Sequence, residues 1–171
     1  VGKEQAELAR CHPDALLKSM GYINDELENP LVAVIHGWSE ISPGHFHLRQ
    51  VAEAAKAGIR ASGGTPVEIP VHGLCGGAGG SGTPSARYFF PYREFTAAMV
   101  EIVLAGYHFD GSVLIPTCDY TIPAYLMGAA RLDIPSIVVT GGYMEPGEYK
   151  GKPVTSSDIY IAYGEYKNGK V

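Results

Sequence analysis

The dipeptide Cys118-Asp119 brings a sulfur ligand and an oxygen ligand together at one point of the chain. It follows an apolar run and precedes a segment with helical spacing. A thiolate just ahead of a helix is stabilised by the unpaired backbone N–H groups and the helix dipole. Thiolates bind iron, and carboxylates suit Mg²⁺. The alternative, equally open, is that Cys118 lies in the core and Asp119 only helps to cap the helix.

A second group of chemically capable residues lies between positions 36 and 47. It comprises one Trp, one Glu and three histidines, His36, His45 and His47, just before a predicted helix. Together they could form a polar pocket wall that holds an anion or a metal-bound acid. They could also be a helix start whose imidazole rings are hydrogen-bonded to backbone carbonyls. The segment alone leaves both interpretations open.

A glycine-rich loop at residues 73–82 formally matches the G-x-G-x-x-G dinucleotide motif through Gly77, Gly79 and Gly82. That motif requires a helix to begin at once and an acidic residue to end the next strand. Residues 83–87 intervene here, and the required acidic position falls in a predicted helix. The chain also lacks Gly-Lys-Ser/Thr, which excludes a P-loop. We therefore predict a flexible loop that wraps a ligand or another subunit.

The elements that must position these residues alternate between strands and helices. Short apolar runs predict strands at 31–35, 67–71, 111–115 and 134–139, with a weaker fifth at 158–162. Apolar residues at helical spacing predict helices at 4–20, 46–61, 92–105 and 121–131. This order predicts an α/β fold: a mostly parallel sheet of about five strands with helices on both faces, a Rossmann-like three-layer sandwich. Ligands of such sheets bind at the carboxyl ends of the strands, where the residues above lie.

Three details of the predicted helices can be compared directly with a structure. Pro13 is expected to break the first helix. Thr121 is expected to be the N-cap of the last one, with Pro123 in its first turn. The helix at 92–105 is expected to be amphipathic through one set of apolar residues. These are Phe95, Met99, Ile102 and Val103.

The composition restricts the class of protein. The chain has 171 residues, of which 46% are hydrophobic and 18% charged, which suits one domain with a buried core. A net charge of -5 argues against nucleic acid as a partner. The sequence contains neither a membrane-spanning apolar stretch nor a signal peptide, so we expect a soluble cytoplasmic protein. Cys11, Cys75 and Cys118 form no C-x-x-C pair, which favours reduced thiols.

Four motifs in this order and approximate spacing resemble the N-terminal domain of the dihydroxy-acid dehydratase/6-phosphogluconate dehydratase family. They are Pro-Gly-His-Phe-His-Leu at 43–48, Ile-Pro-Thr-Cys-Asp at 115–119, Leu-Met-Gly-Ala-Ala-Arg-Leu-Asp-Ile-Pro at 126–135 and Gly-Gly-Tyr-Met-Glu-Pro-Gly at 141–147. Members are hydro-lyases that use an iron–sulfur cluster and Mg²⁺. They dehydrate 2,3-dihydroxy acids or sugar acids to 2-keto acids.

The resemblance implies a domain organisation as well as an activity. Residues 1–171 would be one α/β domain that normally continues into a β-rich domain absent from this chain. The family's dimers place the site near the subunit interface. We accordingly expect a small-molecule hydroxy acid as ligand, and either a homo-oligomer or a partner subunit that supplies the rest of the site.

The resemblance also implies roles for individual residues. Cys118 matches a cluster ligand and Asp119 a Mg²⁺ ligand, while Cys75 is a possible second cluster ligand. Gly141 and Gly142 match a loop that borders the same pocket. His45 and His47 would help to shape that pocket. The family's serine base and its remaining cluster cysteine belong to sequence beyond residue 171, so the catalytic residue is unknown here.

The sequence departs from the family pattern at three positions. Tyr120 stands where many members have a lysine that can be carbamylated to hold the metal. Gly76 stands where a carboxylate is common, and Gly44 where one subgroup has a cluster cysteine. These departures keep two alternatives open beside a dehydratase. One is a non-catalytic homologue that acts as a binding or assembly subunit, and the other is an unrelated Rossmann-like module that binds a small molecule.

Overall fold

A parallel sheet of four strands forms the centre of the molecule. The structure is a computed structural model that describes residues 3–80 and 82–170. The strands are β1 (Leu31–His36), β2 (Thr65–Pro70), β3 (Gly111–Ile115) and β4 (Ser136–Val138), in the order β2-β1-β3-β4. The predicted α/β class is confirmed, with four parallel strands in the sheet rather than about five.

The register of the sheet aligns the carboxyl ends of its central strands. His36, the last residue of β1, pairs with Pro70 on one side and Ile115 on the other. Pro70 is tolerated because it ends an edge strand, where its missing N–H leaves no ladder bond unmade. The loops that follow β1, β2 and β3 therefore leave the sheet at the same edge.

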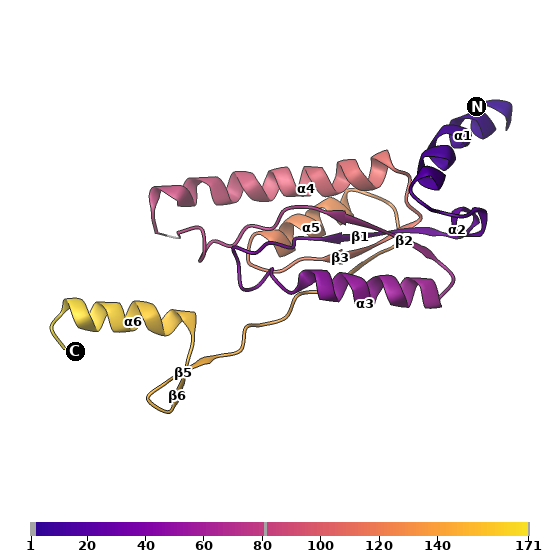
Figure 1. Cartoon of the computed structure of the whole chain (residues 1–171). Coiled ribbons are helices and arrows are strands. Elements are labelled where there is room, and N and C mark those ends of the chain that lie inside the picture. Colours follow the sequence, from indigo (N-terminus) through magenta and orange to yellow (C-terminus); the bar gives the residue numbers. More distant parts are fainter. Residues whose placement is uncertain (1–2, 81, 171) are drawn as a thin grey trace.

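Helices cover both faces of this sheet (Figure 1). On one face lies α3 (Leu48–Ala61), which packs through Leu48 and Ala52 against Val34 and Ile115. On the other face lie α4 (Phe89–Gly106) and α5 (Thr121–Ala130). Alternate residues of β1 thus point to opposite cores, which is why its sequence is apolar without interruption.

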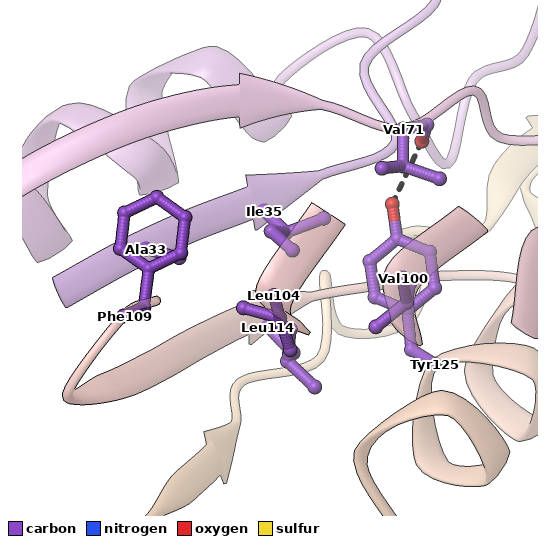
Figure 2. Close-up of a cluster of buried hydrophobic side chains, with 8 residues drawn as sticks. All are labelled: Ala33, Ile35, Val71, Val100, Leu104, Phe109, Leu114 and Tyr125. Atoms are coloured by element: carbon purple, nitrogen blue, oxygen red, sulfur yellow. Dashed lines mark hydrogen bonds between the residues drawn. The ribbon is translucent and has the colours of Figure 1, made fainter. Parts of the chain in front are cut away.

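The larger core lies between the sheet and the pair α4 and α5. Figure 2 shows its eight buried side chains, which come from both helices, from β1 and β3 and from the segments beside them. Tyr125 is fully buried, and its hydroxyl donates a 2.7 Å hydrogen bond to the backbone oxygen of Val71. Burial raises the pKa of the Tyr125 phenol well above its ordinary value, so this donor stays protonated.

Helix α4 has the predicted position but turns a different face to the core. Its buried residues are Phe89, Thr96, Ala97, Val100 and Leu104. Of the predicted apolar set, Val103 packs partly against the core, whereas Phe95, Met99 and Ile102 face outward, Phe95 with 77% exposure. That part of the prediction was wrong, because α4 is apolar around most of its circumference and its spacing does not mark one face.

Two further details of the predicted helices were also wrong. The first helix, α1 (Lys3–Ser19), continues through Pro13. The N-cap of α5 is Tyr120, and Thr121 is the first helical residue, so no side-chain hydroxyl caps this helix.

Short elements connect the larger ones. These are α2 (Asn24–Glu28) and the 3₁₀ helix η1 (Pro84–Tyr88).

The segment after β4 forms an arm that lies apart from the sheet (Figure 1). It consists of the hairpin β5 (Gly147–Tyr149) and β6 (Lys152–Val154), followed by α6 (Ser156–Lys167). The strand predicted at 158–162 is therefore wrong. The local signal for a helix is the capping box of Thr155 and Asp158, which outweighs the β-branched and aromatic residues that follow. None of the described helices is long and apolar enough to cross a bilayer.

Candidate functional site

The loops after all four strands of the sheet contribute to the wall of one cavity of about 460 Å³ at the carboxyl edge of the sheet. The loop after β1 contributes Pro43 and Gly44, and the loop after β2 contributes Cys75. The loop between β3 and α5 contributes Cys118 and Asp119. The structure thus brings together two cysteines and an aspartate from separate parts of the chain.

A second hollow of about 390 Å³ adjoins the first and shares Pro43, Gly44, Gly142 and Met144 with it. Its wall includes His47 and Gly141. The Nε2–H of His47 donates a 2.9 Å hydrogen bond to the backbone oxygen of Gly141. His47 therefore ties the loop after β4 to the start of α3, in addition to lining the hollow.

The backbone is forced into a rare conformation at Cys118. This residue has a backbone φ of 67°, in the left-handed region that residues other than glycine seldom adopt. A Cβ added at Gly44 would lie 3.3 Å from the Cys118 sulfur, so the loop after β1 also approaches this thiol closely. Such conformations persist where the surrounding structure holds them, often at functional sites.

The Cys75 thiol lies in a pocket of hydrogen-bond donors. Burial alone would raise its pKa, but hydrogen bonds from the backbone N–H of Ala78, the Ser42 hydroxyl, the Cys118 thiol and the backbone N–H of Gly77 bring the pKa below its ordinary value. A concave group of backbone N–H donors stabilises an anion in this way. Cys75 is therefore the member of the pair that ionises first.

The Cys118 thiol has the opposite tendency. Burial, reinforced by the charge of Cys75 and the hydrogen bond between the two thiols, raises the pKa of Cys118 to about 11. Asp119 adds to this increase, while the Ser42 hydroxyl opposes it. At neutral pH the pair thus retains a proton, which a metal ion bound to both sulfurs must displace.

His45 lies behind the cavity wall. Its side chain is fully buried, and it lines neither of the two hollows described above. Its Nδ1 lies 2.8 Å from the hydroxyl oxygen of Ser42 and 3.8 Å from the sulfur of Cys118. Burial, with the charges of His72 and His47, lowers the pKa of His45 to about 4, so the ring is neutral at physiological pH. His45 thus acts on the cavity through Ser42 and Cys118.

Ser42 is the residue of this site that the sequence did not single out. Its side chain is 1% exposed, and its hydroxyl oxygen lies 2.8 Å from Nδ1 of His45. The same hydroxyl lowers the pKa of both thiols. The sequence feature that could have indicated Ser42 is its position three residues before His45, because residues at this spacing can contact each other across one turn. The backbone N–H of His45 does donate to the oxygen of Ser42 at 3.0 Å. A lone serine ahead of a proline is otherwise typical of any turn.

The departures from the family pattern also have structural positions. The ring of Tyr120 packs against Phe89 and Phe90, with centroids 5.2 and 5.8 Å apart, and does not line the cavity. Gly76 is buried beside Cys75 and contributes no side chain. Within residues 3–80 and 82–170, no three His, Cys, Asp or Glu side chains are grouped closely enough to hold a metal ion. The described residues therefore provide two sulfurs and a carboxylate, short of a complete metal site.

The fold and this site define a class: an α/β domain with a ligand cavity at the carboxyl edge of a parallel sheet, lined by two thiols and a carboxylate. Comparison with known protein families then shows which family within that class the chain resembles. The family model described as dihydroxy-acid/6-phosphogluconate dehydratase N-terminal matches residues 29–171. The chain belongs to this family, as the four motifs predicted, which argues against an unrelated Rossmann-like module.

Curated relatives support the same assignment over most of the chain. A dihydroxy-acid dehydratase of Pyrococcus furiosus is 47% identical over 164 residues, which is 96% of this chain and 30% of that protein. The dihydroxy-acid dehydratase of Methanococcus maripaludis is 46% identical over 157 residues, 92% of this chain and 28% of that protein. The chain thus spans less than a third of the length of these relatives.

Proposed function

We propose that this chain is the α/β part of a hydro-lyase that dehydrates 2,3-dihydroxy acids or sugar acids to 2-keto acids. The observation that carries the proposal is the meeting of Cys75 and Cys118 in one cavity, beside the carboxylate of Asp119. Family membership supports the reaction class. Among family substrates, both branched dihydroxy acids and aldonic acids fit the proposal.

The donor set suits an iron–sulfur cluster with an adjacent Mg²⁺. Cys75 and Cys118 would hold the cluster, and Asp119 would bind Mg²⁺ through its carboxylate. When bound, the cluster supplies an iron that acts as a Lewis acid on the departing hydroxyl. The remaining ligands and the base would come from a second domain, an identical subunit or a partner subunit. In that arrangement residues 1–171 form one domain of the complete enzyme.

The residues of this chain would bind and orient the hydroxy acid. The backbone around Gly141 and Gly142 and the ring of His47 form the wall of the adjoining hollow, where the far end of the acid would lie. The donors around Cys75 lower the pKa of its thiol, which favours the thiolate that a metal binds. Because both cysteines must be reduced thiols for this purpose, the reducing cytoplasm is the compartment that suits the protein.

The decisive experiment compares three cysteine variants of the full-length protein, purified without oxygen. We expect the wild-type protein to contain iron and sulfide, to absorb visible light through sulfur-to-iron charge transfer, and to form a 2-keto acid from dihydroxy or sugar acids. Cys75→Ser and Cys118→Ser should each lose most of the iron and the activity. Cys11→Ser, at an exposed position in α1, is the matched control and should keep both. A wild-type protein without iron and sulfide would contradict the proposal.

A second candidate function is that of a non-catalytic binding or assembly subunit. It is favoured by Tyr120, whose ring packs away from the cavity, and by Gly76, which offers no carboxylate. If it is correct, Cys118→Ser will leave the biological activity of the protein unchanged. Complete loss of that activity in the same variant would exclude this candidate.

A further inference from the structure

We propose that Tyr92 is a positioning residue for the two cysteines of the cavity. Its hydroxyl ties the loop before Cys75 to the helix after Cys118, and so sets how far apart the two sulfurs lie. Tyr92 lies near the start of α4 and lines neither of the two hollows described above. The joint role of the sulfurs as metal ligands rests on the proposed function, whereas the tie between the two loops does not.

The Tyr92 hydroxyl holds the loop after β2 at two points. The backbone N–H of Leu74, the residue directly before Cys75, donates to the phenol oxygen at 2.9 Å. The phenol donates its own hydrogen to the backbone oxygen of His72 at 2.5 Å. Within the described part of the chain, no backbone–backbone hydrogen bond holds residues 72–74. The approach to Cys75 is therefore fixed by a side chain of α4.

The same phenol oxygen contacts the start of α5. The Thr121 hydroxyl lies 3.1 Å from it. A phenol has one hydrogen, and because that hydrogen goes to His72, Thr121 must be the donor in this contact. Thr121 is fully buried, and the backbone N–H of the next residue, Ile122, donates to the oxygen of Cys118 at 3.1 Å. The tie through Tyr92 thus joins the two cysteine-bearing segments.

This tie matters because the two sulfurs come from different loops. Cys75 and Cys118 line one cavity, so one metal ion binds both only when the loops keep a suitable separation. The backbone N–H of Gly79 donates to the Cys75 oxygen at 2.8 Å, but this bond stays inside one loop. Ligands that are held in place before a metal arrives lose less conformational entropy on binding it. Tyr92 therefore strengthens metal binding without contacting the metal.

The test measures Cd²⁺ binding by the full-length protein in its metal-free form, prepared without oxygen and followed by cadmium–thiolate absorption. Tyr92→Phe keeps the ring and loses the hydroxyl. We expect it to raise the Kd for Cd²⁺ about tenfold, as is typical of partners just outside the ligands of a metal. Tyr125→Phe is the matched control and should bind Cd²⁺ as the wild type does. Its hydroxyl bonds Val71, which the sheet also holds through a backbone bond to His36.

A double-mutant cycle separates positioning from general damage to the fold. In Cys75→Ser only one of the two sulfurs remains, so there is no separation left to set. Adding Tyr92→Phe to Cys75→Ser should therefore leave the Kd for Cd²⁺ unchanged. An equal rise in Kd with and without Cys75 would overturn the inference.

A further variant guards against loss of stability. Tyr92→Phe alone leaves the buried Thr121 hydroxyl without its partner, which is destabilising. Tyr92→Phe/Thr121→Val removes both partners of that bond and should bind Cd²⁺ as weakly as Tyr92→Phe. Wild-type affinity in this double variant would overturn the inference. The proposed function would still stand, because it depends on the iron, sulfide and activity of the wild-type protein, and their absence would not alter the Cd²⁺ comparison.

Discussion

The fold changes the acid–base chemistry of His45. In water an imidazole has a pKa of about 6.5. Burial, with His72 and His47 nearby, lowers the pKa of His45 to about 4. The unfolded chain therefore binds more protons than the folded protein between these two values. As the pH falls through this window, the free energy of unfolding must fall with it.

We predict that the free energy of unfolding decreases by about 2 kcal/mol through His45 when the pH is lowered from 7.5 to 5. Urea unfolding at both pH values measures this difference. In His45→Gln the same pH change should lower the free energy of unfolding by about 2 kcal/mol less than in the wild type. His12→Gln, which alters an exposed histidine, should keep the full dependence. Equal pH dependence in the wild type and His45→Gln would contradict the prediction.

The raised pKa of Cys118 has a separate consequence for metal binding. With a pKa of about 11, this thiol is protonated throughout the neutral range. A soft ion such as Cd²⁺ must displace its proton, which makes the affinity about tenfold higher for each added pH unit. We predict a Kd for Cd²⁺ about 100-fold lower at pH 8.5 than at pH 6.5. Titration of the cadmium–thiolate absorption measures this, and Cys118→Ser should show a much weaker dependence.

At the scale of the elements, the contact between α4 and α5 depends on one glycine. A Cβ at Gly128 would lie 2.7 Å from the Cβ of Val100 and 2.8 Å from the oxygen of Ala97. The two helices therefore approach backbone to backbone at this point. Their contact carries the larger core, including the buried hydroxyl of Tyr125 that reaches Val71. The same contact positions the N-terminus of α5 behind Cys118.

We predict that Gly128→Ala lowers the free energy of unfolding by about 1–3 kcal/mol, because the clash outweighs the better helix propensity of alanine. Gly58→Ala is the matched control. Gly58 lies inside α3 with no atom within 4 Å of an added Cβ. That change should raise the free energy of unfolding by about 0.5–1 kcal/mol. Denaturant unfolding measures the free energy of unfolding of both variants. A Gly128→Ala variant more stable than the wild type would contradict the close packing of α4 and α5 at this glycine.

At the scale of the whole molecule, the sheet domain has a buried core, whereas the side chains of the arm after β4 are exposed or partly exposed. No residue between 142 and 170 is buried. The exposed side chains of α6 include Ile159, Ile161 and Tyr163. The arm reaches the site through Ser156 and Met144, which line the cavity beside the thiols. It therefore contributes to the wall of the site much more than to the core.

We predict that removal of residues 147–170 from this chain changes the free energy of unfolding of the sheet domain by less than about 1 kcal/mol, because exposed residues contribute little to stability. Urea unfolding of the two forms, followed by circular dichroism, measures the difference. A loss of more than about 3 kcal/mol would mean that the arm packs against the sheet in solution.

The sequence by itself determined the positions of β1, β2, β3 and β4 and of the helices on both faces. Each of these elements is set by a local pattern, an apolar run or a helical spacing that a short window contains. The sequence also singled out Cys118 and Asp119 as candidate ligands, because they closely follow a strand and precede a helix. The local pattern failed where it was ambiguous, as on the uniformly apolar α4 and in α6.

Only the tertiary structure decided which distant residues meet. Cys75 comes beside Cys118 because strand order and register bring the loops after β2 and β3 to one edge of the sheet. The burial of His45 and the position of Ser42 depend on the same convergence. No short window of sequence contains the meeting of Cys75 and Cys118, since their spacing along the chain says nothing of their distance in space. The protonation of the site follows from them, because desolvation and hydrogen bonding act through space.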